Sequence, residues 1–293
     1  MEFIKAKTIL SKVKDGREWY GIDYNMNLYR GCPHQCIYCD SRSNCYHIEN
    51  FDIVRGKDQA LYILEKELAK KVHGVVGIGA MSDTYNPFET KYEQTRGALK
   101  LIAKYNFGVS IDTKSDLILR DLDLLKEINS HNNVIIKFTI TTPHDDLASL
   151  IEPNVCVSSK RFQAIKKLSD NGIFVGVMLN PVLPFITDSE EDIKKLVKLA
   201  AMNGAKFIHT YMGMTLRENQ RDYYFQKLDQ YFPGLKKKYL AYYKDRYDCS
   251  VPNYHHLYKI FTTECQKYGL LYQMSDIIAA YKKEEAEKQL SLF

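Results

Sequence analysis

Three cysteines lie close together near the amino end of this 293-residue chain, in the order Cys32, Cys36 and Cys39. Their C-x3-C-x2-C spacing lets one short loop wrap a metal cluster, because the thiolates converge while neighbouring backbone amides solvate the sulfurs. Most protein-held iron–sulfur clusters use four cysteines, and this segment offers no obvious fourth. We therefore expect the protein to hold three irons of a [4Fe-4S] cluster and to leave the fourth iron open to a ligand that is not protein.

A structural zinc site is the main alternative for the same three thiols. Zinc is usually bound by four nitrogen or sulfur ligands, and His34 or His47 could complete that set. The aromatic residue Tyr38, directly before Cys39, and the position of the loop after the first expected strand favour the iron–sulfur interpretation.

The composition predicts a folded cytoplasmic protein. Hydrophobic residues make up 45% of the chain, yet no run approaches the roughly 18 apolar residues of a membrane span, and the amino end lacks the features of a signal peptide. Seven cysteines, an odd number, indicate metal ligands in a reducing compartment rather than a disulfide framework. A net charge of +5 is compatible with a polyanionic partner without requiring one.

Apolar β-branched segments alternate with helix-period segments after the cysteine loop, which is typical of parallel strands joined by crossover helices. Six such units are fewer than the eight of a closed barrel, so we expect an α/β fold with a partial (β/α)6 TIM-like barrel, a lateral opening and a C-terminal helical extension. The barrel should take residues 1–212, the extension 213–284 and a tail 285–293. The expected strands cover residues 22–28, 75–81, 109–112, 134–140, 173–179 and 207–212.

Capping residues predict where three of the helices begin, and glycines predict where two of them end. The first helix should begin at Asn86 and run to about residue 105, with proline at its first position. The others should run from Ser158 to Gly172 and from Asp188 to Gly204.

Polar residues follow two of the expected strands, at the end where a parallel barrel keeps its active site. Ser82 and Asp83 follow the strand at 75–81, and Lys114 follows the next strand. A lysine at this edge could pair with the carboxylate of a ligand, although an isolated lysine is usually solvated surface.

With these segments the chain resembles the radical S-adenosylmethionine (SAM) enzymes, and among them the branch related to spore photoproduct lyase. In these enzymes the open iron takes the amino and carboxylate groups of SAM, and electron transfer cleaves the sulfonium to a 5′-deoxyadenosyl radical. The resemblance covers roughly residues 20–212. The matching segments are residues 26–32, 82–89, 95–96, 113–115, 119–125, 139–142, 150–153, 161 and 176–184.

The resemblance implies roles for individual residues. Cys32, Cys36 and Cys39 would ligate the cluster, which an electron donor such as flavodoxin or ferredoxin would reduce. Glu152 and Arg161 could equally form a structural ion pair. The residues implied to bind or border SAM are Tyr38, Asp83 and Glu152, with Ser82, Lys114 and Arg161 at its methionyl part and Asn180 near its adenine.

Two positions depart from spore photoproduct lyase itself. Ala80 stands where the lyase has a hydrogen-donating cysteine, and Asp40 stands where it has a tyrosine. The route that returns hydrogen to a substrate radical is therefore missing unless Cys45, Cys156 or a tyrosine replaces it. We expect hydrogen abstraction from a nucleic acid, with a DNA lesion as the favoured substrate, by an enzyme that is not a conventional spore photoproduct lyase. RNA, a small metabolite, or a zinc-stabilised nucleic-acid-binding module without catalysis are the alternatives.

Residues 235–247 interleave lysines and arginine with tyrosines, a combination suited to phosphate neutralisation and base stacking on DNA. Leu235, Tyr239, Tyr242 and Arg246 also recur at helical spacing, which equally predicts a helix that packs on the barrel.

The chain ends in the pentapeptide Gln-Leu-Ser-Leu-Phe, from Gln289 to Phe293. Its apolar side chains have no reason to stay in water, so they either dock on their own domain or enter the groove of a partner. The segment resembles the clamp-binding motif of bacterial polymerases and repair proteins. We therefore expect an interaction with the replication sliding clamp that recruits the protein to DNA.

Overall fold

The computed structural model of the protein describes residues 1–14 and 19–282. The expected tail, with its clamp-binding pentapeptide at 289–293, lies outside the described residues. Within them, no helix combines the length and the apolar character needed to cross a bilayer.

Six parallel strands form the inner layer of the molecule, and each lies where the sequence predicted one. Their apolar residues are buried on both faces, as expected for a parallel sheet covered by helices. The strand order is β10-β9-β8-β7-β6-β3-β2, with β2 antiparallel at the edge. The two edge strands do not pair, so the predicted partial barrel is confirmed. The strands are β2 (Leu10–Lys12), β3 (Tyr24–Met26), β6 (Val75–Ile78), β7 (Gly108–Thr113), β8 (Val134–Thr139), β9 (Phe174–Leu179) and β10 (Ile208–Thr210).

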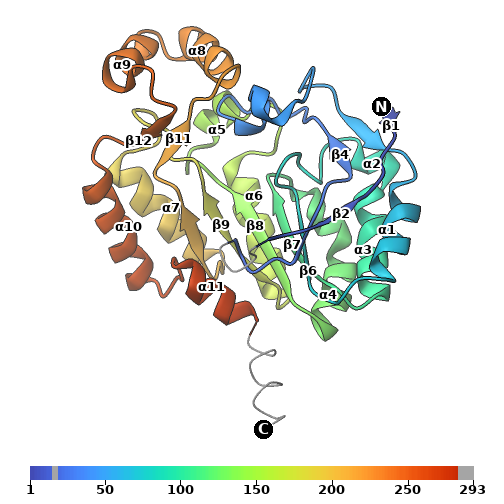
Figure 1. Ribbon diagram of the computed structural model, residues 1–293. Helices are drawn as coiled ribbons and strands as arrows, with labels where there is room; N and C mark the ends of the chain where they lie inside the picture. The colour runs from blue at the N-terminus through green and yellow to red at the C-terminus, as the bar shows by residue number, and fades with distance from the viewer. Residues whose placement is uncertain (15–18, 283–293) are drawn as a thin grey trace.

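Helices surround this sheet on the outside (Figure 1). Each is amphipathic and places its apolar stripe against the strands, as Leu99 and Ile102 do in α3. Beyond α7, the outer layer is continued by α10, which buries Leu257 and Phe261. The helices of this layer are α1 (Ala60–Leu68), α3 (Gln94–Lys104), α4 (Leu122–His131), α6 (Ser158–Asp170), α7 (Glu190–Met202) and α10 (Tyr254–Lys267).

The helix predicted over residues 86–105 is wrong as a single element. A short helix α2 (Glu89–Tyr92) comes first, and the chain turns at Glu93, which has a φ of +48°, before α3 begins. The buried carboxylate of Glu89 holds this turn, since it accepts hydrogen bonds from the Thr95 amide at 2.7 Å and from Arg120 Nη2 at 3.0 Å. Tertiary contacts of one side chain thus override the local helix signal.

The other two helix predictions are close to the structure. Helix α6 begins at Ser158 as predicted, and Gly172 follows its end with a φ of +76°. Helix α7 begins after Ser189 rather than Asp188, because the Ser189 hydroxyl accepts the hydrogen bond of the Asp192 amide at 3.1 Å.

The chain after Met212 forms the C-terminal helical extension, together with a strand pair that the sequence did not predict. Strand β11 (Gly213–Thr215) pairs antiparallel with β12 (Asp248–Ser250). Figure 1 shows α8 (Gln220–Tyr231) and α9 (Leu235–Tyr243) at one end of the molecule and α11 (Met274–Tyr281) near the other. Gln220 Nε2 donates to the carbonyl oxygen of Tyr38 at 2.9 Å, and Asn219 Nδ2 donates to that of Arg42 at 2.9 Å. The extension therefore braces the cysteine loop.

The basic, tyrosine-rich segment at 235–247 is partly a packing element. Tyr239 and Tyr243 are buried, and the Tyr239 hydroxyl donates to the carbonyl oxygen of Pro184 at 2.7 Å. Tyr242, predicted to lie on the same face as Tyr239, is 47% exposed. The packing interpretation is thus confirmed for Tyr239, and only in part for Tyr242, whose ring packs edge-on against Phe185.

A small second sheet flanks the cysteine loop. It has the order β1 (Glu2–Ile4), β5 (Arg55–Lys57) and β4 (Tyr29–Arg30). Strands of two or three residues that contain charged side chains show no alternating pattern, so these strands could not be predicted. The amide of Cys32 donates to the carbonyl oxygen of Phe51 at 2.8 Å, which ties the start of the loop to the chain leading into β5.

Candidate active site

The three cysteines of the motif lie on the loop that follows β4, and all three line one cavity of about 430 Å³. That volume is in the range of small-molecule sites in proteins. The loop can pass close to the segment that leads into β5 because Gly31 comes directly before Cys32 and has a φ of +79°. A Cβ atom at Gly31 would clash with the carbonyl oxygen of Ile53. Only glycine therefore fits at the position that starts the cysteine loop.

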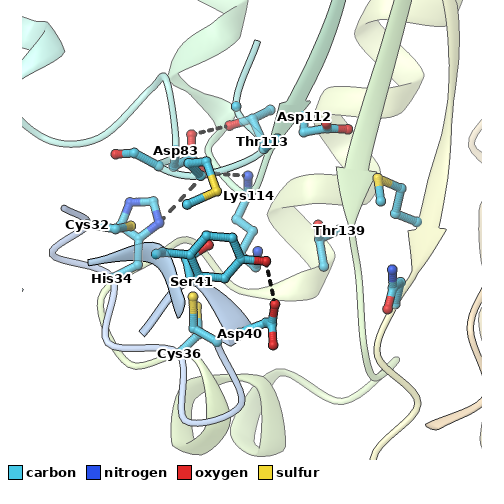
Figure 2. Close-up of a pocket in the computed structure, with 18 of the residues that line it drawn as sticks. Cys32, His34, Cys36, Asp40, Ser41, Asp83, Asp112, Thr113, Lys114 and Thr139 are labelled. Carbon is cyan, nitrogen blue, oxygen red and sulfur yellow. Dashed lines mark hydrogen bonds and ion pairs between the residues drawn. The ribbon is translucent and has the colours of Figure 1, made fainter. Parts of the chain in front are cut away.

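The carboxyl ends of the barrel strands form the facing wall of the cavity (Figure 2). Ser82 and Asp83 follow β6, Lys114 follows β7 and Asn180 follows β9, and all four line the cavity. Parallel strands end at the same edge of a sheet, which is why residues far apart in the sequence meet here.

Asp83 is held by neighbouring groups on the wall itself. Its Oδ1 accepts from Thr113 Oγ1 at 2.8 Å and from the Tyr85 amide at 2.9 Å, while Oδ2 accepts from the Lys114 amide at 2.7 Å (Figure 2). Next to it, the Ser82 hydroxyl donates to the carbonyl oxygen of Gly31 at 2.6 Å. These bonds fix the strand ends to one another and to the cysteine loop.

Tyr38, Glu152 and Arg161 lie behind the cavity and do not line it. The Tyr38 hydroxyl donates to Glu152 Oε1, and Glu152 Oε2 lies 2.5 Å from Arg161 Nη1. Arg161 also donates to the carbonyl oxygens of Cys156 at 2.8 Å and Thr139 at 2.9 Å. The structural ion pair that the sequence left open between Glu152 and Arg161 is present, and both side chains are fully buried.

Electrostatics in the cavity keep the thiols protonated while no metal is bound. Burial raises the pKa of Cys32 to about 12 and raises the pKa values of Cys36 and Cys39 as well, although the positive charge of Lys114 acts in the opposite direction on the last two. Burial alone would lower the pKa of Lys114, but Cys36 in its thiolate form and the carboxylates of Glu152 and Asp83 outweigh burial and raise that pKa. A metal must displace these thiol protons when it binds. The three thiolates then compensate the positive charge of the bound metal.

The donor set fits a cluster better than a single ion. In the part of the chain that the structure describes, no three His, Cys, Asp or Glu side chains come close enough together to hold one metal ion. A four-iron cluster carries its thiolates on separate irons, so it accepts sulfurs that lie further apart than the ligands of one zinc. Of the two histidines considered for zinc, His47 lines a different hollow, and the Nδ1 atom of His34 lies 3.6 Å from Asp83.

Sequence reasoning missed several residues of the cavity lining. Asp112, Thr139 and Met178 lie in the last two positions of β7, β8 and β9, so the rule that located Lys114 could also have found them. No local pattern indicated the other residues, which come from an irregular segment or from short 3-10 helices after the cysteine loop. The missed residues are Trp19, Ser41, Tyr46, Asp112, Thr139 and Met178.

A family model described as the radical SAM superfamily matches residues 26–216. The chain belongs to this superfamily. An uncharacterized protein of Methanocaldococcus jannaschii is 34% identical over 192 residues, which cover 64% of this chain and 69% of that protein. An uncharacterized protein of Mycobacterium tuberculosis is 28% identical over 249 residues, which cover 82% of this chain and 73% of that protein.

Solved structures of spore photoproduct lyase share the fold. A single-residue mutant of the lyase aligns with a TM-score of 0.68 at 13% identity, covering 92% of this chain and 81% of the lyase chain. A double mutant with bound AdoMet and dinucleoside spore photoproduct aligns with a TM-score of 0.63 at 15% identity, covering 92% and 81%. The resemblance predicted from the sequence is thereby confirmed at the level of superfamily and fold.

This protein is therefore a radical SAM enzyme, and its superfamily implies a [4Fe-4S] cluster and SAM as cofactors. Family membership favours the iron–sulfur interpretation of the cysteine loop over the zinc alternative.

Proposed function

We propose that this radical SAM enzyme abstracts a hydrogen atom from a nucleic acid, with a DNA lesion as the favoured substrate, and that it differs from spore photoproduct lyase in how hydrogen is returned. The shared fold supports the first part of the proposal, and the residues of the cavity support both parts. The seven cysteines, all of them free thiols, suit a reducing cytoplasm where a flavodoxin or ferredoxin could supply the electron.

Trp19 carries the proposal for the substrate class. This side chain, the only tryptophan of the chain, lines the same cavity as the three cysteines and is 37% exposed. Its ring packs edge-on against Tyr20 and His209, which leaves part of its surface open at the cavity. An aromatic ring so placed can stack a nucleobase, and base stacking on aromatic side chains contributes about 1–3 kcal/mol per base.

The chain's own residues would hold the two cofactors. Cys32, Cys36 and Cys39 would ligate the cluster, and the positive charge of Lys114 would pair with the carboxylate of SAM. The Asn180 amide offers a donor and an acceptor for the adenine edge. When bound, the cluster and SAM together supply the electron transfer and the radical that abstracts hydrogen.

Hydrogen return is the step in which we expect this enzyme to differ from the lyase. Ala80 and Asp40 both line the cavity, and beyond the three ligand cysteines no other thiol among the described residues does. Tyr46 does line it, and its hydroxyl donates to Asp40 Oδ2 at 2.7 Å. Burial, together with Asp40, raises the pKa of Tyr46 to about 12, so the phenol keeps its hydrogen at neutral pH. We propose that Tyr46 replaces the missing cysteine as the hydrogen donor: its phenol would give a hydrogen atom to the substrate radical, and the tyrosyl radical so formed would be restored by one electron from the flavodoxin or ferredoxin and a proton from solvent.

A substrate survey tests this function. Anaerobically reconstituted protein is incubated with SAM, a reductant and either undamaged DNA, ultraviolet-irradiated DNA, RNA or no nucleic acid, and release of 5′-deoxyadenosine is measured. We expect irradiated DNA to give the largest stimulation. Equal release in all four reactions would contradict the proposal, and stimulation by RNA alone would move the substrate from DNA to RNA.

The synthetic spore lesion provides the second arm of that survey. Because Ala80 has no labile hydrogen, we expect repair well below that of spore photoproduct lyase assayed in parallel. Turnover equal to that of the lyase would show that the substitution at position 80 does not matter.

A further inference from the structure

A row of unpaired cations begins beside the catalytic cavity. A second cavity of about 290 Å³ shares the lining residues Tyr46 and Met81 with the catalytic cavity, so the two lie next to each other. Lys5, Lys7 and Lys57 line it together with Arg30, and its lining contains no carboxylate. The small sheet positions these cations, because Lys5 and Lys7 follow β1 and Lys57 ends β5.

The row continues along α1. A third hollow, of about 500 Å³, shares Lys7 with the second and is also lined by Lys66, Lys70 and Lys71. Its one carboxylate, Glu67, is already engaged, since Oε2 accepts from the amides of Ile9 at 3.0 Å and Leu10 at 2.8 Å. Figure 1 shows β1 and α1 on the same side of the molecule. We call these seven cations the basic track; they are Lys5, Lys7, Arg30, Lys57, Lys66, Lys70 and Lys71.

Several cations of the basic track form no ion pair in the part of the chain that the structure describes. Within the described residues, no carboxylate lies within ion-pairing distance of Lys5, Lys7, Lys57 or Lys70. Burial and the like charge of Arg30 lower the pKa of Lys57, even though Glu67 acts in the opposite direction. An anion in this hollow would relieve that repulsion, and a row of cations suits a ligand with a row of anions.

We propose that the basic track binds the phosphodiester backbone of the nucleic-acid strand whose nucleotide occupies the catalytic cavity. The proposal rests on the proposed function and adds the path of the strand, which runs from the cavity at Tyr46 over the small sheet to α1. A strand that places one nucleotide in the cavity must lead its neighbouring phosphates away across the adjoining surface. A row of hollows that begins next to the cavity fits a narrow nucleic-acid strand better than it fits the broad surface of a protein partner.

A salt titration with matched variants tests the track. Binding of a labelled 12-nucleotide DNA strand to the anaerobically reconstituted protein is followed by fluorescence anisotropy at several salt concentrations, with an RNA strand of the same sequence as a second arm. The track variant is Lys5→Gln/Lys7→Gln/Lys57→Gln. The control variant, Lys160→Gln/Lys195→Gln/Lys198→Gln, removes the same charge from exposed positions on α6 and α7. A third variant, Lys236→Gln/Lys237→Gln/Lys238→Gln, tests the basic segment on α9.

The track variant should lose at least about tenfold in affinity at 0.1 M salt, and the slope of log affinity against log salt should fall by about 2, or about 0.7 for each phosphate contact on a single strand. The control and α9 variants should stay close to wild type.

Equal losses in the track and control variants, or a loss confined to the α9 variant, would overturn the track while the proposed function stood. Lost binding of reduced flavodoxin with unchanged binding of DNA and RNA would also overturn it, because the partner would then be a protein. Wild-type protein that binds neither strand would instead refute the nucleic-acid substrate itself. Circular dichroism and thermal unfolding of each variant confirm that it is folded.

Discussion

The catalytic cavity and the basic track lie side by side and are both rich in charged residues, but charges are paired around the cavity and, among the described residues, unpaired on the track. Around the cavity, Asp83 accepts three hydrogen bonds, and Glu152 is paired with Arg161. On the track, Lys5 and Lys57 have no carboxylate partner within the described residues. Paired and buried charges fix the positions of loops, whereas unpaired charges remain available to a partner from outside. The difference suggests that the cavity is preorganised for its cofactors and that the track is open to exchange.

Removing a thiol from the cavity should have the largest effect. Cys36→Ala leaves two protein ligands for a cluster that needs three, so we expect loss of bound iron and loss of SAM cleavage. Iron and sulfide analysis with an assay for 5′-deoxyadenosine checks this. Cys265→Ala is the matched control, because that thiol is buried in α10 away from the cavity. Normal iron content in Cys36→Ala would show that the cysteine loop does not hold the cluster.

Removing one cation from each region should change the free energy of unfolding by very different amounts, because one cation is paired and the other is not. Arg161→Ala leaves Glu152 buried without a counter-charge, and such a loss costs about 3–5 kcal/mol in the free energy of unfolding. Lys70→Ala removes an exposed, unpaired cation of the track and should change that free energy by no more than about 0.5 kcal/mol. Urea unfolding of both variants in the same cluster-loaded state measures the two costs, and similar costs would contradict the distinction between the regions.

Tyr46 lies where the two regions meet, and its removal should affect only one step. Tyr46→Phe keeps the ring and removes the hydroxyl that donates to Asp40. We expect release of 5′-deoxyadenosine to continue while formation of repaired product falls about 100-fold, the lower end of what a positioned proton-transferring side chain contributes. The ratio of product to 5′-deoxyadenosine measures the effect. A parallel fall in both quantities would indicate a structural role for Tyr46 in holding the cysteine loop.

The carboxyl end should contribute least to the chemistry and most to recruitment. Deletion of residues 289–293 removes the proposed clamp-binding pentapeptide and should abolish binding to a bacterial sliding clamp, measured by surface plasmon resonance. Turnover on a short oligonucleotide should stay at the wild-type level, since no clamp is present. Unchanged affinity for the clamp after deletion would refute this partner.

The sequence predicted the parts of the fold that depend on periodicity. Runs such as 134–140 are apolar and β-branched because both faces of β8 are buried, and that pattern is visible without a structure. The small sheet escaped prediction because strands of two or three residues carry no period. The break at Glu93 escaped it too, because the buried carboxylate of Glu89 depends on Arg120, which is distant in the sequence.

The residues of the candidate site could likewise be predicted only where the signal is local in the sequence. Spacing identified Cys32, Cys36 and Cys39, and the strand-end rule identified Lys114, because both signals are local. Trp19 reaches the cavity only through the tertiary fold, so no pattern around it could have shown its place. For the same reason, the sequence could not decide whether Glu152 and Arg161 form an ion pair. The structure shows that pair, and a role for either residue in binding SAM stays a prediction.

Isotope transfer tests the central claim most directly. A DNA oligonucleotide deuterated at the damaged nucleotide is incubated anaerobically with the reconstituted enzyme, SAM and a reductant, and 5′-deoxyadenosine is examined by mass spectrometry. If the cavity acts on nucleic acid, deuterium should appear in 5′-deoxyadenosine and depend on Cys32, Cys36 and Cys39. Abundant 5′-deoxyadenosine without deuterium, released at the same rate when DNA is absent, would contradict the account.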